Sequence, residues 1–117
     1  MAHHKIDYCE FAAGNLEATE LFFETLLSWT FTHYGEDYID CNDGGLMVGF
    51  YRAPLTSTQD SGGAMLTFYS DDLTASQAAV EAAGGKLTKE IFSFPGGRRF
   101  QFLEPSGNEF SFWTKDI

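Results

Sequence analysis

The stretch Asn15-Leu16-Glu17-Ala18-Thr19 recurs in a related form as Asp72-Leu73-Thr74-Ala75-Ser76, which lies 57 positions further along the chain. In each copy a short apolar run ends at a residue whose side chain can cap a helix, Asn15 in the first copy and Asp72 in the second. An internal repeat of this kind predicts two copies of one structural unit.

Each unit is predicted to contain a strand, a helix and three further strands. The first helix is expected at 16–27, with four side chains at helical spacing turned toward the core: Ala18, Leu21, Phe22 and Leu26. The second helix is expected at 73–83, because Gly84-Gly85 is a stop signal. Apolar runs bounded by turn residues predict strands at 6–13, 29–34, 37–42, 45–52, 64–70, 86–94, 98–104 and 108–114.

The length of 117 residues and the content of 44% hydrophobic residues are typical of a single folded domain, here 1–117. We expect module one at 5–52, a linker at 53–63 and module two at 64–114. The sequence begins without an apolar run of signal-peptide type, and no stretch reaches the roughly 18 apolar residues of a membrane helix. These features favour a cytoplasmic protein with no membrane partner.

The charge is strongly acidic, with 17 Asp and Glu against 7 Lys and Arg and a net charge of −10. Such a field disfavours nucleic acid as a partner and favours cationic ligands, although solubility alone also explains it. Cys9 and Cys41 lie in no metal-binding or redox motif, so reduced thiols are expected.

The two repeated helix starts, followed by Ala82-Ala83-Gly84-Gly85 and Glu104-Pro105-Ser106-Gly107-Asn108, occur in an order that resembles the vicinal oxygen chelate superfamily of glyoxalases, bleomycin resistance proteins and extradiol dioxygenases. The last segment is the most specific, since it is similar to the family's Asp-Pro-x-Gly-Asn hairpin. The resemblance implies an α+β fold of two βαβββ modules, whose curved mixed sheets form a cup with the helices outside. It also implies a homodimer.

Enzymes of this family hold a divalent metal with ligands from the first and last strand of each module. Counting from the helix starts and the hairpin places these positions at Tyr8, Gly49, Met65 and Ser111. None of these residues is a histidine or a carboxylate, the ligands that such metals prefer, so we expect no metal and no other cofactor. A slip of one residue in this register would instead bring Glu10 or Glu109 to a ligand position.

The strand period of two sorts the side chains into two faces. The apolar face, which includes Phe11, Phe68, Phe110 and Phe112, is expected to pack under the helices. The other face is expected to line the cup and bind a ligand through Tyr8, Met47, Met65, Thr67, Tyr69, Arg99, Gln101, Ser111 and Trp113. Aromatic rings with a few polar groups are typical of a small-molecule pocket, although the same rings could fill the interior or a dimer interface.

Glu10 and Glu109 are the candidate catalytic residues, because a carboxylate that faces an apolar cup can have a raised pKa and act as an acid or base. The alternative is a solvated carboxylate at the rim or one paired with Arg99. Arg99 could also clamp a ligand carboxylate, which leaves Arg98 on the opposite strand face. No second ligand stands at metal spacing from any of the three histidines.

Three functions fit these features. The first is metal-free binding of a small aromatic or cationic compound, which the missing metal ligands favour. The second is an enzyme with a divergent active site, either a lactoylglutathione-lyase-like isomerase or lyase or a dioxygenase-related protein, with Glu10 or Glu109 as its base. The third is an interaction subunit whose cup is filled by a partner. Fold alone does not choose among them.

Overall fold

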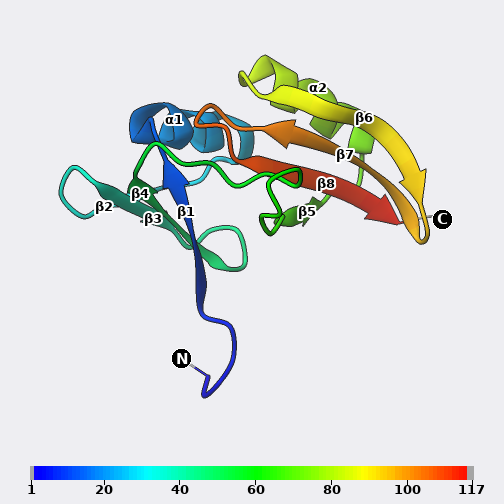
Figure 1. Ribbon diagram of the computed structural model, residues 1–117. Coiled ribbons are helices and arrows are strands. Elements are labelled where there is room, and N and C mark those ends of the chain that lie inside the picture. Colours follow the sequence, from blue (N-terminus) through cyan, green and yellow to red (C-terminus); the bar gives the residue numbers. More distant parts are fainter. Residues whose placement is uncertain (1, 116–117) are drawn as a thin grey trace.

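The computed structural model describes residues 2–115, which form two modules with the same order of elements (Figure 1). Module one contains β1 (Tyr8–Ala13), α1 (Leu16–Leu27), β2 (Thr32–His33), β3 (Tyr38–Cys41) and β4 (Met47–Arg52). Module two contains β5 (Thr67–Tyr69), α2 (Leu73–Ala82), β6 (Lys86–Phe94), β7 (Gly97–Leu103) and β8 (Glu109–Lys115). The predicted βαβββ plan is confirmed.

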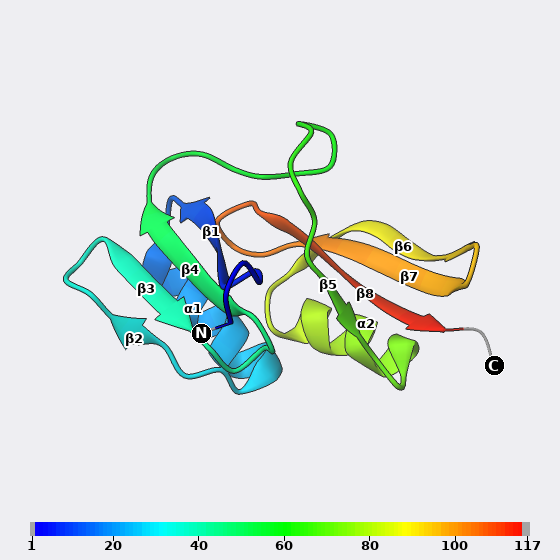
Figure 2. The same ribbon diagram turned by 90° about the horizontal axis from the view of Figure 1, so that it is seen from below.

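Each module forms one four-stranded sheet, and Figure 2 shows the two sheets next to each other. The strand orders are β1-β4-β3-β2 and β5-β8-β7-β6. In both sheets the first strand pairs in parallel with the last strand of its module, while the other pairs are antiparallel. Parallel strands need a long connection between them, and in each module this connection contains the helix and two further strands.

The repeated stretch acts as a pair of helix starts, as predicted. The Asn15 side chain accepts a hydrogen bond of 3.1 Å from the backbone N–H of Ala18, and Asp72 accepts one of 3.1 Å from Ala75. Each bond satisfies one of the free N–H groups of the first helical turn. Neither helix of the described chain is long and apolar enough to cross a membrane.

One core serves both modules, and α1 lies at its centre. The Phe23 ring packs on Phe50 of the first sheet at 5.8 Å and on Phe110 of the second at 5.3 Å, measured between ring centroids. Phe11 of β1 also contacts Phe110 directly, at 5.1 Å. The helix-facing sides of both sheets therefore share one apolar layer, which confirms the predicted division of the strand faces.

The predicted buried face of α1 is partly wrong. Leu21 is 63% exposed, whereas Thr19 and Phe23 are fully buried. The reason is that α1 packs against both sheets, so the buried face of the helix includes Phe23 and excludes Leu21. Trp29 stacks on Phe23 at 4.9 Å and lies outside β2, which spans only Thr32–His33 and is shorter than predicted.

The hairpin that carried the resemblance joins the modules. Glu104 is buried and accepts hydrogen bonds from Thr19 Oγ1 at 2.6 Å, from the Ser106 N–H at 2.9 Å and from Asn108 Nδ2 at 2.8 Å. Asn108 Nδ2 also donates to the carbonyl of Ala12 on β1, at 2.7 Å. This motif therefore ties the turn between β7 and β8 to α1 and β1, which is a structural role.

Candidate functional site

The candidate site lies on the outer faces of the two sheets, by which we mean the sides turned away from the shared core. Of the predicted residues, the outer face of module one carries Tyr8, Glu10 and Met47, together with Tyr38, Asp40 and Tyr51, which the prediction left out. The outer face of module two carries Thr67, Tyr69, Arg99, Gln101, Glu109, Ser111 and Trp113. Met65 precedes β5 and is half-buried. One chain thus divides the predicted set between two sheets.

A row of three aromatic rings and one arginine crosses the whole sheet of module two, and we call it the aromatic row. Its four side chains are paired in register on neighbouring strands: Tyr69, Trp113, Arg99 and Phe92. Tyr69 meets Trp113 edge to face at 5.2 Å, and the Arg99 guanidinium lies 5.4 Å from the centroid of Phe92. Phe94 flanks the row and faces the same guanidinium at 5.5 Å. Such contacts hold a cation and flat rings at one surface.

A polar row runs directly beside the aromatic row. Its members, again paired in register, are Thr67, Ser111, Gln101 and Lys89. The Thr67 and Ser111 hydroxyls are 2.6 Å apart and hydrogen-bonded. Gln101 is fully buried, and its amide nitrogen donates to Glu109 at 3.0 Å. Two buried atoms on this face, Arg99 Nε and Gln101 Oε1, have no hydrogen-bond partner in the part of the chain that the structure describes.

Glu109 is buried in a set of hydrogen bonds and does not match its prediction. It accepts from the backbone N–H of Gln59 at 2.8 Å, and from Thr88 Oγ1 and Gln101 Nε2. Burial alone would raise the pKa of Glu109, but these hydrogen bonds and the charge of Lys89 outweigh it, so the pKa is lowered. Glu109 lies neither at a solvated rim nor in an ion pair with Arg99.

The other candidate carboxylate, Glu10, is exposed and pairs with a phenol. Tyr38 donates its hydroxyl to Glu10 at 2.9 Å, and burial together with this hydrogen bond raises the pKa of Tyr38 above its ordinary value. To reach Glu10 the Tyr38 ring passes over Gly49, where an added Cβ would collide with the phenol oxygen. Tyr38 therefore fills the space that a side chain at position 49 would need.

The four residues that we assigned to the family's metal-ligand positions do not fit a metal here. Tyr38 occupies the room at Gly49, and the Ser111 hydroxyl is already paired with Thr67. Tyr8 and Met65 add a phenol and a thioether, which are poor ligands for first-row divalent metals. Within residues 2–115, moreover, no group of three or more His, Cys, Asp or Glu side chains could hold a metal ion.

Several residues of the site could not be found from the strand period. The pairing of β6 with β7 shifts register between Leu87 and Lys89 and again between Lys89 and Phe92. These irregularities bring both Lys89 and Phe92 to the outer face, although their positions differ by an odd number. Gln59 belongs to the linker, where no pattern indicated a contact with the sheet.

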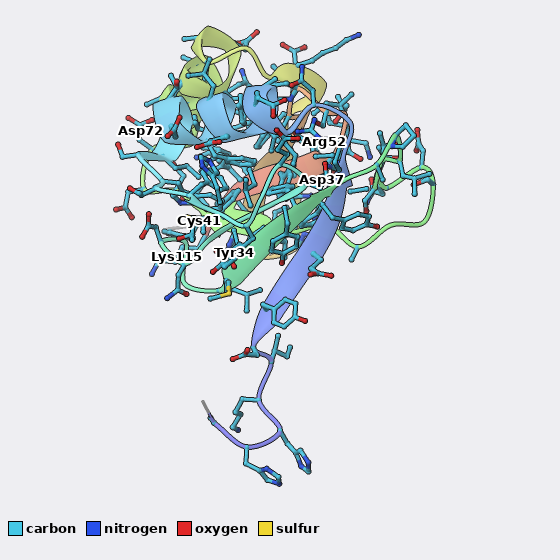
Figure 3. The ribbon with its side chains drawn as sticks, turned by 90° about the vertical axis from the view of Figure 1, so that its left-hand side faces the viewer. Tyr34, Asp37, Cys41, Arg52, Asp72 and Lys115 are labelled. Atoms are coloured by element: carbon cyan, nitrogen blue, oxygen red, sulfur yellow. The ribbon has the colours of Figure 1, made fainter. Side chains whose placement is uncertain are left out.

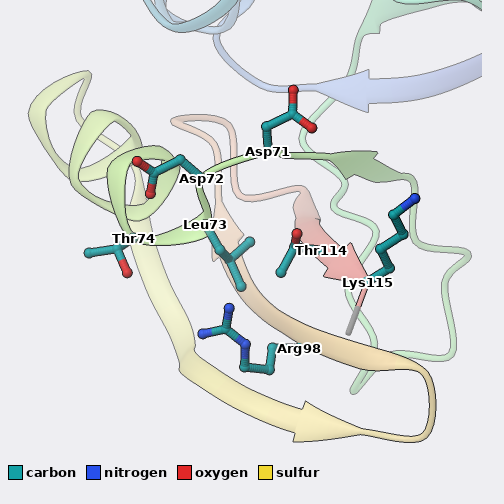
Figure 4. Close-up of a pocket in the computed structure, with 7 residues that line it drawn as sticks. All are labelled: Asp71, Asp72, Leu73, Thr74, Arg98, Thr114 and Lys115. Atoms are coloured by element: carbon teal, nitrogen blue, oxygen red, sulfur yellow. The ribbon is translucent and has the colours of Figure 1, made fainter. Parts of the chain in front are cut away.

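Arg98 lies on the helix side, opposite to Arg99, as predicted. Its side chain is exposed and lines a shallow pocket near the start of α2, whose walls also include Asp71 and Leu73 (Figure 4).

On the helix side of module one, Arg52 forms ion pairs with Glu17 and Asp37, and Arg52 and Asp37 are labelled in Figure 3. These contacts fasten α1 to the turn before β3.

Comparison with known proteins fits this geometry. A family model described as the Glyoxalase/Bleomycin resistance protein/Dioxygenase superfamily matches residues 5–112. The chain therefore belongs to this superfamily. A comparison with curated proteins gave no significant match.

Solved structures with the same fold span nearly the whole chain. A glyoxalase-related enzyme from Fulvimarina pelagi is 16% identical with a TM-score of 0.78, over 96% of this chain and 88% of the other. A glyoxalase/bleomycin resistance protein/dioxygenase family enzyme from Burkholderia phytofirmans PsJN is 14% identical with a TM-score of 0.78, over 96% and 99% of the two chains. A lactoylglutathione lyase from Agrobacterium tumefaciens is 18% identical with a TM-score of 0.72, over 97% and 95%. At these identities the likeness concerns the fold.

Proposed function

We propose that this protein binds a small organic molecule without a metal, on the outer face of module two. The observation that supports this most directly is the aromatic row of Tyr69, Trp113, Arg99 and Phe92 beside a row of hydroxyl and amide groups. Flat rings supply contact area, and a few fixed polar groups orient a ligand. The absence of metal-binding side chains at the family positions removes the usual means of activating a substrate.

We also propose that a second copy of the chain completes the site. The outer face of module one carries Glu10 and Asp40 among tyrosines, whereas that of module two carries the cations Arg99 and Lys89 beside the buried Glu109. The carboxylates of module one can pair with these two cations in a second copy, so module one of one copy suits module two of its partner. Tyr8 and Tyr69, 53% and 46% exposed in one chain, would then be covered.

Binding is favoured over turnover by the state of the two carboxylates. The pKa of a general base should lie near the working pH. Three hydrogen bonds to Glu109 help to lower its pKa, so its predicted role as a base loses support. Glu10 accepts a hydrogen bond from Tyr38 and remains the candidate base if the protein is an enzyme.

Native mass spectrometry of protein purified without denaturant tests both parts of the proposal. We expect an assembly of twice the chain mass of 13.0 kDa that carries an additional small molecule. A mass of 13.0 kDa at micromolar concentration would contradict the dimer. A bound polypeptide in place of a small molecule would instead support the interaction subunit.

A further inference from the structure

A small cavity lies between the linker and the outer face of module two, beside the polar row. Its volume is about 210 Å³, and its walls include Gln59, Asp60, Thr88, Lys89, Gln101 and Glu109. The linker is held there by backbone contacts, since the N–H of Glu109 donates to the carbonyl of Ser57 at 2.9 Å and the N–H of Gln59 donates to the Glu109 carboxylate at 2.8 Å. The cavity is therefore built by two parts of the chain that are far apart in sequence.

The wall contains a buried acceptor, Gln101 Oε1, that has no partner among residues 2–115. Gln101 has no exposed surface, and its amide nitrogen already donates to Glu109 at 3.0 Å and to Gln59 Oε1 at 3.2 Å. Buried polar atoms in native proteins are nearly always hydrogen-bonded, so an isolated acceptor at a cavity wall points to a donor from a ligand.

The charges around the cavity select the kind of donor. Glu109 and Asp60 are both acidic, and the hydrogen bonds on Glu109 lower its pKa and keep it ionised. Lys89 also lines this wall, and its ammonium lies over the Phe92 ring at 5.5 Å from the centroid. The net charge of −10 adds a long-range attraction for cations.

We propose that this cavity binds the ammonium group of a primary amine, with Gln101 Oε1 and the carboxylates of Glu109 and Asp60 as its acceptors. The aromatic row beside it would hold an aromatic portion of the same molecule. An ammonium offers three donors, which matches the three acceptors. This inference rests on the proposed function, because both use the outer face of module two.

Titration with benzylamine and with benzyl alcohol, its neutral counterpart, tests the inference. Trp113 emission reports contact with the aromatic row, and the NMR signals of the Gln101 side-chain amide report occupation of the cavity. We expect benzylamine to bind about tenfold more tightly than benzyl alcohol, since a hydrogen bond to a charged group has about that effect. The Gln101→Leu variant should lose most of this preference.

Two further variants protect the test against a loss of folding in Gln101→Leu. Asp60 is exposed in the linker, so Asp60→Asn should fold normally and bind benzylamine more weakly with no change for benzyl alcohol. Glu81→Gln, an exposed position on α2, removes the same charge on the helix side and should leave both affinities unchanged. If the two variants weaken benzylamine binding equally, the preference for benzylamine comes from the overall charge of the protein. That result would overturn the ammonium site.

The remaining outcomes separate this inference from the proposed function. If both probes quench Trp113 with equal affinity, the ammonium site is wrong while the binding face stands. If neither probe binds and native mass spectrometry also finds no small molecule, both the ammonium site and the proposed function fail.

Discussion

The turn between β3 and β4 and the turn between β7 and β8 occupy the same place in two copies of one plan, yet only the second joins the modules. In module one, Asp43 is exposed and accepts a single hydrogen bond of 2.8 Å from the Thr30 backbone. In module two, the buried Glu104 connects its own turn to Thr19 of α1. Two turns with the same topology therefore need not contribute equally to stability, because a buried carboxylate with several donors contributes more than an exposed carboxylate.

The outer faces of the two modules also differ in how deeply their polar groups are buried. On module one the polar contact joins exposed Glu10 to Tyr38. On module two Gln101, Glu109 and Ser111 are buried and the linker lies against them. Module two therefore has the more buried and more fully hydrogen-bonded polar surface, while the polar contact of module one is open to solvent.

The largest expected effect concerns the two turns. Glu104→Ala should destabilise the protein by about 3 kcal/mol, because it leaves several buried donors of Thr19, Ser106 and Asn108 without an acceptor. Asp43→Ala should cost no more than about 1 kcal/mol. Urea unfolding at neutral pH measures both, and equal losses would show that the turn of module two has no special role.

The second prediction concerns the aromatic row. Trp113→Ala should weaken binding of the molecule recovered from the native preparation by at least about tenfold, since it removes the ring between Tyr69 and Arg99. Arg98→Ala lies on the opposite strand face and should have little effect. Isothermal titration calorimetry on folded variants measures both; similar losses would contradict the assignment of the strand faces.

The third prediction compares the carboxylates of the two outer faces across pH. Since the folded protein lowers the pKa of Glu109 below its ordinary value of 4.5, its contribution to stability is present above that pH and is lost as the pH falls through the folded value. Glu109→Gln should therefore cost about 1 kcal/mol at pH 7 and progressively less in acid. Glu10→Gln, on the exposed carboxylate, should be nearly neutral throughout. A Glu109→Gln deficit that grows toward low pH would reverse the assigned direction.

The smallest expected effect is that of chelators. Because Gly49 is covered by Tyr38 and Ser111 is paired with Thr67, EDTA should leave the melting temperature unchanged. Elemental analysis of the native protein should find no stoichiometric nickel, zinc, iron or manganese. Roughly one tightly held metal per chain would show that the family positions were assigned in the wrong register.

The sequence predicted the fold more completely than it predicted the site. Capping residues and apolar alternation are local signals, so the helix bounds and the division of strand faces agree with the structure. The face of α1 was less predictable, because Phe23 is buried by a second sheet that no local pattern indicates. The contacts of Glu109 were not predictable either, since Gln59 reaches it from the linker across 50 positions.

By itself the sequence determined the plan of two βαβββ modules and the lack of histidines and carboxylates at the positions that we assigned to the family's metal ligands, both of which depend on residue type and spacing. Only the tertiary structure decided that Glu104 joins the modules, that Tyr38 covers Gly49 and that Gln101 Oε1 is left without a partner. The physical reason is that the free energy of a polar side chain depends on its burial and on its partners. Those partners come from distant segments whose positions are fixed only when the two sheets close on α1.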